Sequence, residues 1–430
     1  QIRYAVNDVE VLQGVFEKQK LELLQSGLIP TARLEFSIIP AVVEIELHGI
    51  EIDTKKLEVI KDALTKERNE LQQELKNLSS GIADEDSQGD LFGREKQINF
   101  NSPAQVKKIL SKMGHEVDST GIETLEKLDS DFARNMVKYR KASKLLSSFV
   151  EPLPKHINPK TGRIHPEFPQ MGTDTGRFTC QNPNLQQIPH DQEWRDLFTA
   201  RPGHKILTAD YSQIELRIMA EFSQDKAFLE AYRKGIDLHT RTASDVFQVA
   251  IDQVTKDQRN VAKTINFGLC YGMTQKGLSN RLNITEEEAQ SFIKAYYKAY
   301  PVVKNTLDRL GMKAVKEGHS QTVLGRKRYF PKAGSFGQEK AIERKGRNTP
   351  IQSTCGDILK RAVFYIQDEI WNLPAWIINL VHDEVVIEFR EDGEEIMKAL
   401  VEETMIKAGR DFLKLVPVEV DITVDNVWRK

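Results

Sequence analysis

The sequence predicts an α+β protein in which helices predominate and a small antiparallel sheet is assembled from segments far apart in the chain. Three observations lead to this prediction. Residues 9 to 76 show helical apolar periodicity, short β-type runs appear only after Pro154, and the pattern from Gln213 to Lys316 is helical again. A helical insertion of about a hundred residues therefore separates the expected strands.

The length and composition restrict the class of protein. At 430 residues the chain exceeds one compact core, so we expect roughly two to four subdomains. No apolar stretch approaches the roughly 20 residues that span a bilayer, so we expect no membrane partner. Three widely spaced cysteines favour a reducing compartment, the cytoplasm or its equivalent in an organelle or host cell. Because residue 1 is Gln1 rather than Met, we expect a fragment or a processed product.

The net charge of −2 argues mildly against a nucleic-acid partner, but the local distribution of charge is more informative than the sum. Basic clusters lie at residues 138–144, 326–328 and 344–347. Each cluster alone is more typical of a solvated helix face. Their meaning depends on the residues between them.

The N-terminal helices are expected to break at two places. The first break is at residues 27–30, and the second is at 48–53, where Gly49 ends one helix and Asp53 caps the next. Residues 79–97, rich in Gly, Ser and Asp, are expected to form a mobile excursion. Ser102 and Pro103 then begin a further helix.

Two acidic residues follow apolar, strand-like runs. The run Ile206–Ala209 stops at Asp210, and Trp376–Val381 leads into a tight turn that contains Asp383. Burying unpaired carboxylates is costly, so a cation is the expected partner. If the strands pair, the two acids can share Mg²⁺, which accepts a few carboxylates beside water and phosphate oxygens. The alternative is that Asp210 caps a helix and Asp383 makes a turn, which is an even choice for each acid alone and a poor one for both together.

A helix with an unusual stripe is expected to start at Thr255, which forms a capping box with Gln258. Two cations and two aromatic residues then recur every four positions, so they lie on one slanting face. These are Arg259, Lys263, Phe267 and Tyr271. Such a face suits a nucleoside triphosphate, with the cations on the phosphates and the rings on sugar and base. The alternative, an ordinary amphipathic helix, would place its cations and its aromatics on opposite faces.

In these motifs the chain resembles family A DNA polymerases, the bacterial polymerase I type. The three main motifs are Asp210-Tyr-Ser-Gln-Ile-Glu-Leu-Arg217, the stripe from Arg259 to Gly272, and Val381-His-Asp-Glu-Val385. Further blocks agree, among them Thr175-Gly-Arg177, Asp237-Leu-His239 and the run from Glu343 to Gln352. The resemblance extends from about residue 34 to the last residues.

The resemblance implies a right-hand polymerase fold whose palm holds the small sheet, whereas the fingers and thumb are helical. It implies a thumb at 34–153, a palm at 154–220 and 340–430, fingers at 221–339, and at 1–33 the end of a 3′–5′ exonuclease-like domain. The implied activity is template-directed DNA synthesis by a monomer, with primer–template DNA and deoxynucleoside triphosphates as partners.

Residue roles follow from the same resemblance. Asp210 and Asp383 resemble the ligands of two Mg²⁺ ions, with Mn²⁺ as a substitute, and are assisted by the Tyr211 carbonyl and less centrally by Glu384. The residues that resemble nucleotide contacts are Arg259, Lys263, Phe267, Tyr271, His239, Glu215 and Gln213. Among them, Lys263 also resembles a proton donor to pyrophosphate, and Glu215 a steric gate against the ribose 2′-hydroxyl. The residues that resemble DNA contacts are Arg177, Asn184, Gln186, Arg344, Asn348, Gln352 and His382.

The chain departs from the family pattern in two places. Residues 190–197 are shorter than usual, and Arg429-Lys430 ends the sequence without the usual His. Tyr4-(x3)-Asp8 resembles the last exonuclease motif, but the other clustered carboxylates of a nuclease are not in this sequence, so we expect no proofreading from it. Two rival functions are a catalytically inactive DNA-binding accessory and a metal-dependent nuclease. The intact acids disfavour the first, and the triphosphate stripe disfavours the second.

Overall fold

The computed structural model describes residues 2–80 and 98–430, with side chains in the first seven residues described only for Val6. The predicted excursion at 79–97 and the side chain of Tyr4 therefore lie almost wholly outside the described residues. The chain forms two compact units. Unit 1 comprises residues 1–50, 166–187 and 200–430, and unit 2 comprises residues 51–165 and 188–199.

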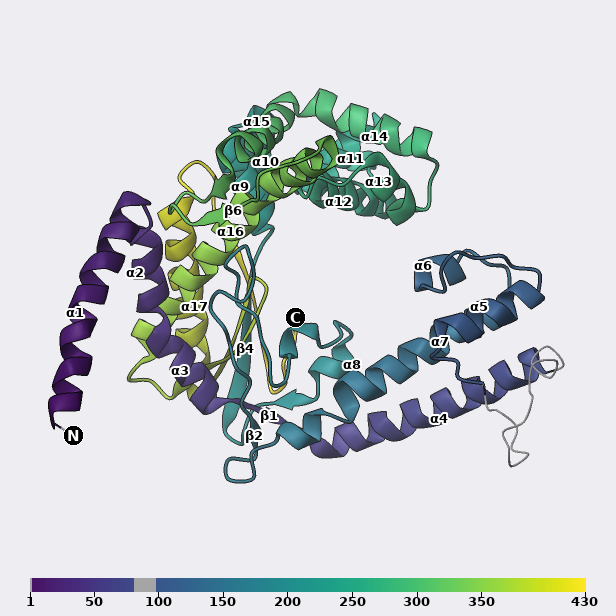
Figure 1. The fold of residues 1–430 in the computed structure, drawn as a ribbon, viewed down its shortest axis with the longest axis horizontal. Helices are drawn as coiled ribbons and strands as arrows, with labels where there is room; N and C mark the ends of the chain where they lie inside the picture. Colours follow the sequence, from purple (N-terminus) through teal and green to yellow (C-terminus); the bar gives the residue numbers. More distant parts are fainter. Residues whose placement is uncertain (1, 81–97) are drawn as a thin grey trace. The chain divides into compact units, whose positions relative to one another are not determined.

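Unit 1 is built on a four-stranded antiparallel sheet with the order β7-β8-β4-β9 (Figure 1). The strands are β4 (His204–Tyr211), β7 (Ala375–Val381), β8 (Glu384–Arg390) and β9 (Val420–Asp425). The pairing register sets Asp210 opposite Glu384 on β8 and opposite Asp421 on β9. The sheet brings together segments about 170 positions apart, as the sequence predicts.

Strand β9 was not predicted. Its sequence Val-Asp-Ile-Thr-Val-Asp alternates apolar and polar residues, which is the pattern of a half-buried strand, and its side chains are mostly partly exposed. The strand pairs only with β4, at the edge of the sheet. An edge strand buries less apolar surface than a central one, so its sequence carries a weaker signal than the apolar runs of β7 and β8.

Helices fill the interval between β4 and β7, as predicted, apart from a small hairpin of β5 (His319–Gln321) and β6 (Lys327–Tyr329). They are α9 (Ile214–Ser223), α10 (Lys226–Arg233), α11 (Leu238–Phe247), α12 (Lys256–Cys270), α13 (Gln275–Leu282), α14 (Glu286–Ala299), α15 (Pro301–Glu317) and α16 (Phe336–Ile370), with the short turn η5 (Ile251–Gln253). In six of these helices, a side chain just before the helix accepts a hydrogen bond from the first turn and so fixes its start. These caps are Asp225, Asp237, Thr255, Thr274, Thr285 and Ser335.

Two long helices pack together against the sheet. These are α16 and α17 (Glu394–Phe412), which contact each other along their length and touch strands β4, β7 and β8 (Figure 1). The segment between α17 and β9 packs closely on α17. A Cβ on Gly409 of α17 would lie 2.7 Å from Val418 Cγ1. Unit 1 also contains two short 3-10 segments, η4 (Leu185–Gln187) and η6 (Glu391–Gly393).

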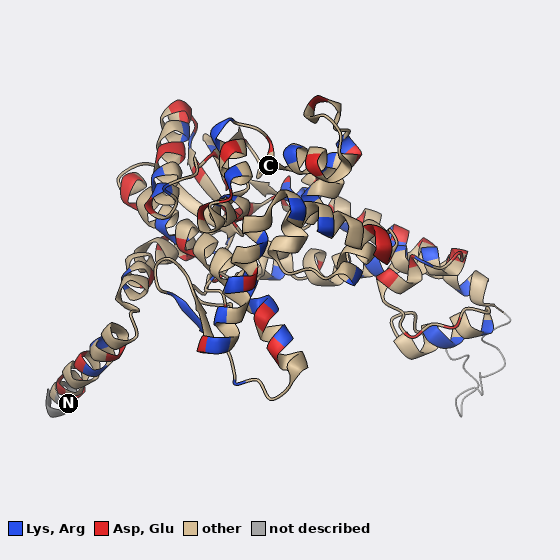
Figure 2. Ribbon diagram, turned by 90° about the horizontal axis from the view of Figure 1, so that it is seen from above, with Lys and Arg blue, Asp and Glu red and all other residues tan. Residues whose placement is uncertain are grey.

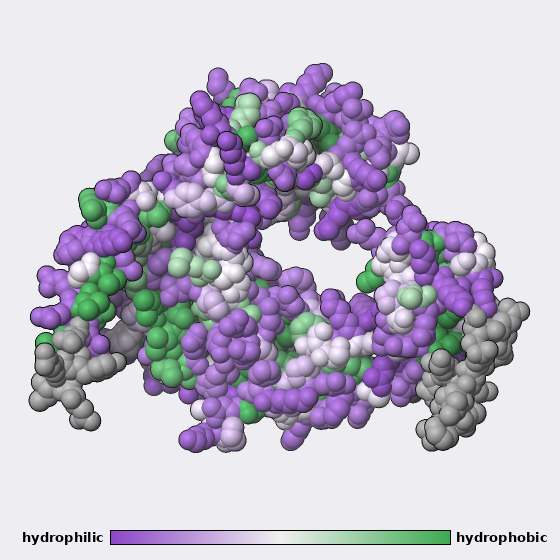
Figure 3. Space-filling model, in the orientation of Figure 1, coloured by the Kyte–Doolittle hydropathy of each residue, from purple (hydrophilic) through white to green (hydrophobic). Residues whose placement is uncertain are grey.

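The first three helices of unit 1 are α1 (Ile2–Gln25), α2 (Ile29–Ser37) and α3 (Ile39–His48). The two predicted breaks are present, with Gly27 in the left-handed region and Gly49 at the end of α3, but the break at Ile38 between α2 and α3 was not predicted. Acidic and basic residues are interspersed along α1 (Figure 2). Apolar side chains also remain exposed on α1 and α3, visible as green areas in Figure 3; they include Val9, Leu12, Phe16, Val43 and Leu47.

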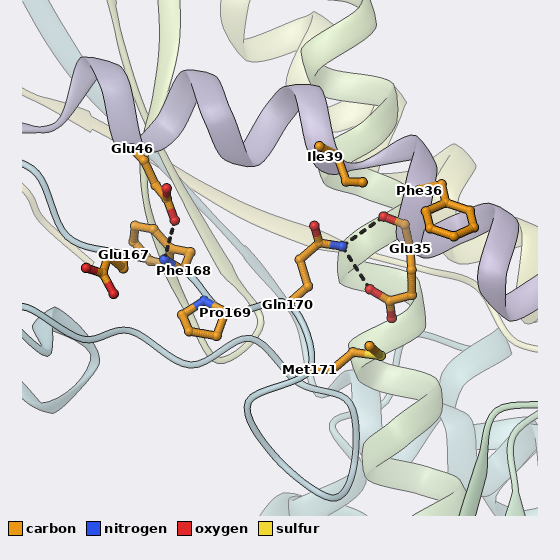
Figure 4. Close-up of a pocket in the computed structure, with 9 residues that line it drawn as sticks. All are labelled: Glu35, Phe36, Ile39, Glu46, Glu167, Phe168, Pro169, Gln170 and Met171. Atoms are coloured by element: carbon orange, nitrogen blue, oxygen red, sulfur yellow. Dashed lines mark hydrogen bonds between the residues drawn. The ribbon is translucent and has the colours of Figure 1, made fainter. Parts of the chain in front are cut away.

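A buried ionic cluster ties α2 to α16 within unit 1. Arg326 Nε donates to Asp357 Oδ1 at 2.7 Å, and Glu35 of α2 accepts from both Arg326 and Lys360. Gln170 completes the cluster, because its amide donates to the Glu35 carbonyl at 2.8 Å and to Glu35 Oε2 at 3.0 Å (Figure 4). Buried charges are stable only when paired in this way, so the cluster fixes α2 against the helical core.

Unit 2 is mainly helical. It contains α4 (Thr54–Ser79), α5 (Pro103–Lys112), α6 (Ile122–Leu125), α7 (Asp131–Leu145) and α8 (Gln192–Arg195), the turns η2 (Leu146–Val150) and η3 (Leu153–His156), and a sheet of β2 (Arg163–Ile164), β1 (Ile50–Ile52) and β3 (Phe198–Thr199). The predicted helix starts at Asp53 and Ser102 are confirmed. Phe100, Phe132 and Tyr139 form the aromatic centre of its core. Residues 34–50, which the resemblance assigns to the thumb, belong to unit 1. Among the described residues, no helix combines the length and the apolar character that crossing a bilayer requires.

Candidate functional site

The two predicted acids meet at one end of the unit 1 sheet. Asp210 lies near the end of β4, and Asp383 lies in the two-residue turn between β7 and β8. His382 takes the left-handed conformation in that turn, with φ of 57°, and so allows the chain to reverse tightly. The Tyr211 amide lies 3.5 Å from the Asp383 carbonyl. The alternative in which the acids merely cap a helix and a turn separately is therefore not supported.

The electrostatics of this pair suit a cation. Burial and then the nearby Asp210 charge raise the pKa of Asp383 to about 7. Asp210 Oδ1 is buried and accepts no hydrogen bond from the described part of the chain. In those same residues no group of three or more His, Cys, Asp or Glu side chains forms a metal cage. Two close carboxylates with an unused oxygen fit Mg²⁺, which retains water and phosphate ligands.

Two residues close to the C-terminal end of the sequence contact acidic residues of this site, and the sequence did not predict either contact. Trp428 Nε1 donates to Glu384 Oε1 at 2.6 Å, and both side chains are buried. Lys430 Nζ lies 2.5 Å from Asp210 Oδ2 and 3.5 Å from Glu384 Oε2. Glu384 is therefore engaged by protein groups on both oxygens, whereas Asp383 is not paired in this way.

The predicted stripe on α12 lies on one face of the helix. The capping box of Thr255 and Gln258 is present. Phe267 and Tyr271 stack with ring centroids 6.3 Å apart, Lys263 is exposed, and α12 ends at Cys270, so Tyr271 is its C-cap. The rings and the cations are thus presented together rather than divided between core and solvent.

His239 lies against this face and is electrically neutral. Its ring centroid is 5.5 Å from that of Phe267. Burial, with further lowering by the Arg259 and Lys263 charges, brings the pKa of His239 to about 4, although Asp237 opposes the shift. The Asn266 amide donates to His239 Nδ1 at 3.1 Å, which leaves the proton on Nε2. At neutral pH His239 can therefore donate a hydrogen bond to a phosphate but cannot neutralise it.

Asp237 lies in a block that carries the resemblance, but the sequence predicted no role for it. It caps α11 and also holds Arg259, whose Nε and Nη2 lie 2.8 and 3.1 Å from its two carboxylate oxygens. Burial raises its pKa, but Arg259 and Thr240 outweigh that effect and bring it to about 2. Gln213 Nε2 donates to the same carboxylate at 3.3 Å. Asp237 thus binds two predicted nucleotide contacts, Gln213 and Arg259. The signal available in the sequence was the position of Asp237 before a helix, where an aspartate is a preferred N-cap.

Glu215 is buried and paired. Its carboxylate accepts from Arg177 Nη2, and its side chain is 9% exposed. Burial raises the pKa of Glu215, and the Arg177 charge counteracts this only in part. Glu215 therefore does not lie on an exposed face of α9. The ion pair joins Glu215, a predicted nucleotide contact, to Arg177, a predicted DNA contact.

Four of the predicted DNA contacts lie on or beside α16. Arg344, Asn348 and Gln352 recur every four residues on α16, and the Arg177 side chain lies beside Gly356 one turn further along. Asn348 Oδ1 is buried without a bond from the described residues. Gln186 Nε2 donates to the Leu380 carbonyl at 3.0 Å, so its amide also holds the edge of β7. Asn184 and His382 are exposed.

Two cavities of unit 1 differ in their relation to these residues. One of about 890 Å³ lies at the aromatic end of α12 and has a basic wall. Its cations are Lys294, Lys298, Lys304, Lys340, Arg344 and Arg347. The other, of about 560 Å³, lies between α2, α3 and residues 167–171, and no predicted site residue lines it (Figure 4).

Comparisons with known proteins agree with the motifs. The family model of DNA polymerase family A matches residues 61–430. DNA polymerase I of Pseudomonas aeruginosa is 37% identical over 448 aligned residues, covering 99% of this chain and 47% of that protein. The enzyme of Geobacillus stearothermophilus is 34% identical, covering 92% of this chain and 45% of that protein. The chain therefore spans about half the length of these relatives.

A solved structure is also similar. It is the polymerase domain of Pol1 from M. smegmatis, in complex with DNA primer–template and dNTP. The similarity covers 95% of this chain and 72% of that one, with a TM-score of 0.85 and 31% sequence identity. Both the sequence and the fold thus match proteins of one family.

Proposed function

Because this chain belongs to DNA polymerase family A, we propose that it extends a DNA primer along a template, using deoxynucleoside triphosphates and releasing pyrophosphate. One observation carries the proposal: Asp210 and Asp383 lie together at the end of the sheet, and their mutual repulsion raises the pKa of Asp383 to about 7 once burial has begun the shift. Paired carboxylates of this kind suit divalent cations better than any protein group.

Asp210, Asp383 and the Tyr211 carbonyl would hold the divalent ions, Mg²⁺ with Mn²⁺ as a substitute. When bound, two such ions favour ionisation of the primer 3′-hydroxyl and stabilise the leaving pyrophosphate. Glu384 is assigned a supporting position, because Trp428 and Lys430 already engage its oxygens.

The residues of α12 would bind and orient the nucleotide. Arg259 and Lys263 neutralise the triphosphate, and Arg259 exchanges its Asp237 partner for phosphate oxygens. The primer 3′-oxygen attacks the α-phosphorus, and the bond from that phosphorus to the bridging oxygen breaks as pyrophosphate leaves. Lys263 Nζ is proposed to give a proton to that departing oxygen. Phe267 and Tyr271 pack against the sugar and the base.

Residues close to the acidic pair and to α12 are proposed to select deoxyribonucleotides over ribonucleotides and to bind the DNA. Glu215, fixed by Arg177, is proposed as the gate that excludes a ribose 2′-hydroxyl. Arg177 and the α16 stripe are proposed to contact the primer–template, together with Asn184, Gln186 and His382. The basic wall of the cavity beside Arg344 supports a nucleic-acid strand as the occupant.

Primer extension tests this function. With Mg²⁺ and four deoxynucleoside triphosphates, the chain should extend a primer, whereas Asp210→Asn and Asp383→Asn should abolish extension. Both variants should still bind primer–template, because phosphate contacts elsewhere supply the affinity. Asp421→Asn is the matched control, since Asp421 is an exposed acid opposite Asp210 on β9. Binding without extension by the unsubstituted chain would identify an inactive accessory instead.

A further inference from the structure

Lys430 brings a positive charge to the carboxylate that is proposed to bind metal. Its ammonium lies 2.5 Å from Asp210 Oδ2 and 3.5 Å from Glu384 Oε2. The Asp210 side chain is only 16% exposed, and that of Glu384 is 1% exposed. The ammonium therefore neutralises charge that has little access to water on its own.

The chain is anchored up to Trp428, two residues before Lys430, whose own side chain is largely exposed. Strand β9 pairs with β4 up to Asp425, and the buried Trp428 anchors the following segment through its bond to Glu384. The Lys430 side chain itself is 51% exposed and sits on a flexible four-carbon stem. It can leave Asp210 for solvent without any movement of the sheet.

We propose that Lys430 is an internal counter-cation that competes with a divalent metal ion for Asp210. The inference rests on the proposed function, because it takes Asp210 as a metal ligand. A divalent ion on Asp210 and the Lys430 ammonium repel each other across the same carboxylate, so the ion binds most tightly once Lys430 has left Oδ2. Lys430 thereby sets the metal concentration at which this site fills, and it keeps the acidic pair neutralised at lower concentrations.

Direct metal binding tests the inference without any measure of catalysis. Mn²⁺ is titrated into the full chain, and free Mn²⁺ is measured by electron paramagnetic resonance. Lys430→Met should bind Mn²⁺ about two- to fivefold more tightly, which is the range that partly exposed ion pairs supply. Lys430→Arg, which keeps the competing charge, should bind as the unsubstituted chain does.

Arg429→Met is the matched control. It removes one positive charge from the adjacent residue, which pairs with Asp425 at 3.2 Å rather than with Asp210. Its Mn²⁺ affinity should change by less than that of Lys430→Met. Equal changes in the two variants would show that only general charge matters and would overturn the inference. Unchanged or weaker binding by Lys430→Met would overturn it as well.

A thermal measurement gives an independent readout. In EDTA, Lys430→Met should melt below the unsubstituted chain, because the acidic pair loses its counter-cation. Mg²⁺ should raise the melting temperature of Lys430→Met by more than it raises that of the unsubstituted chain. The variant Asp210→Asn distinguishes a failure of the Lys430 competition from a failure of the metal site. If Asp210→Asn lowers Mn²⁺ affinity while Lys430→Met does not raise it, only the competition is refuted. If Asp210→Asn binds Mn²⁺ unchanged, the metal site of the proposed function is refuted with it.

Discussion

The substitution Asp383→Asn should stabilise the protein at alkaline pH while it abolishes the proposed activity. Asp383 has a folded-state pKa of about 7, raised from 3.8 by burial and by Asp210. A raised carboxyl pKa means that ionisation opposes folding. The penalty is absent below pH 4, where the group is protonated in both states, grows as the pH rises toward 7, and is complete above 7.

The magnitude follows from the size of the shift. A rise from 3.8 to about 7 corresponds to roughly 4 kcal/mol before screening, at 1.36 kcal/mol per pKa unit. Asp383 is partly exposed, so water screens the repulsion, and about 2 kcal/mol is the expected gain at pH 8. For a unit of this size, such a gain raises the melting temperature by a few degrees.

Thermal unfolding followed by tryptophan fluorescence measures the effect, because three of the four tryptophans belong to unit 1: Trp371, Trp376 and Trp428. Asp383→Asn should melt above the unsubstituted chain at pH 8 in EDTA, and the two melting temperatures should coincide at about pH 3. Added Mg²⁺ should reduce the difference in melting temperature between the two proteins at pH 8. Glu391→Gln, an exposed acid after β8, controls for loss of one charge. A variant that is less stable at pH 8, or equally stabilised at both pH values, would refute the reasoning.

Three further substitutions test other parts of unit 1. Asp237→Asn weakens the pair with Arg259 and should lower the free energy of unfolding by about 1 kcal/mol at pH 7, as measured by urea denaturation. Because the pKa of Asp237 is about 2, this difference should disappear as the pH falls from 4 to 2. Glu215→Ala should raise ribonucleotide incorporation on the order of tenfold in single-nucleotide extension, and unchanged selectivity would remove the gate. Gly409→Ala should destabilise by about 1–3 kcal/mol in calorimetry, because its Cβ would overlap Val418; a neutral effect would show that the helix can shift.

The sequence predicts those parts of the structure whose signal is local. The apolar runs that end at Asp210 and Asp383 define β4 and β7, and the four-residue spacing from Arg259 to Tyr271 defines the face of α12. The capping box at Thr255 is equally local. In each case one segment contains both the pattern and its physical reason.

Contacts between distant segments could not be predicted in the same way. Lys430 meets Asp210 across 220 positions, and Asp237 meets Arg259 across 22. Both contacts depend on where two elements lie in space, which neither segment specifies alone. Glu215 illustrates the same limit: its position on α9 is local information, but its burial depends on Arg177 from another part of the chain.

The strand order β7-β8-β4-β9 also governs how the protein can be made. When β4 leaves the ribosome, neither of its neighbours exists, because β8 and β9 are translated about 170 or more residues later. Both edges of β4 stay unpaired during that interval and are open to association with other chains. The acidic centre is therefore among the last features to assemble, and a nascent chain that stops before β8 has no such centre, whatever else of it has folded.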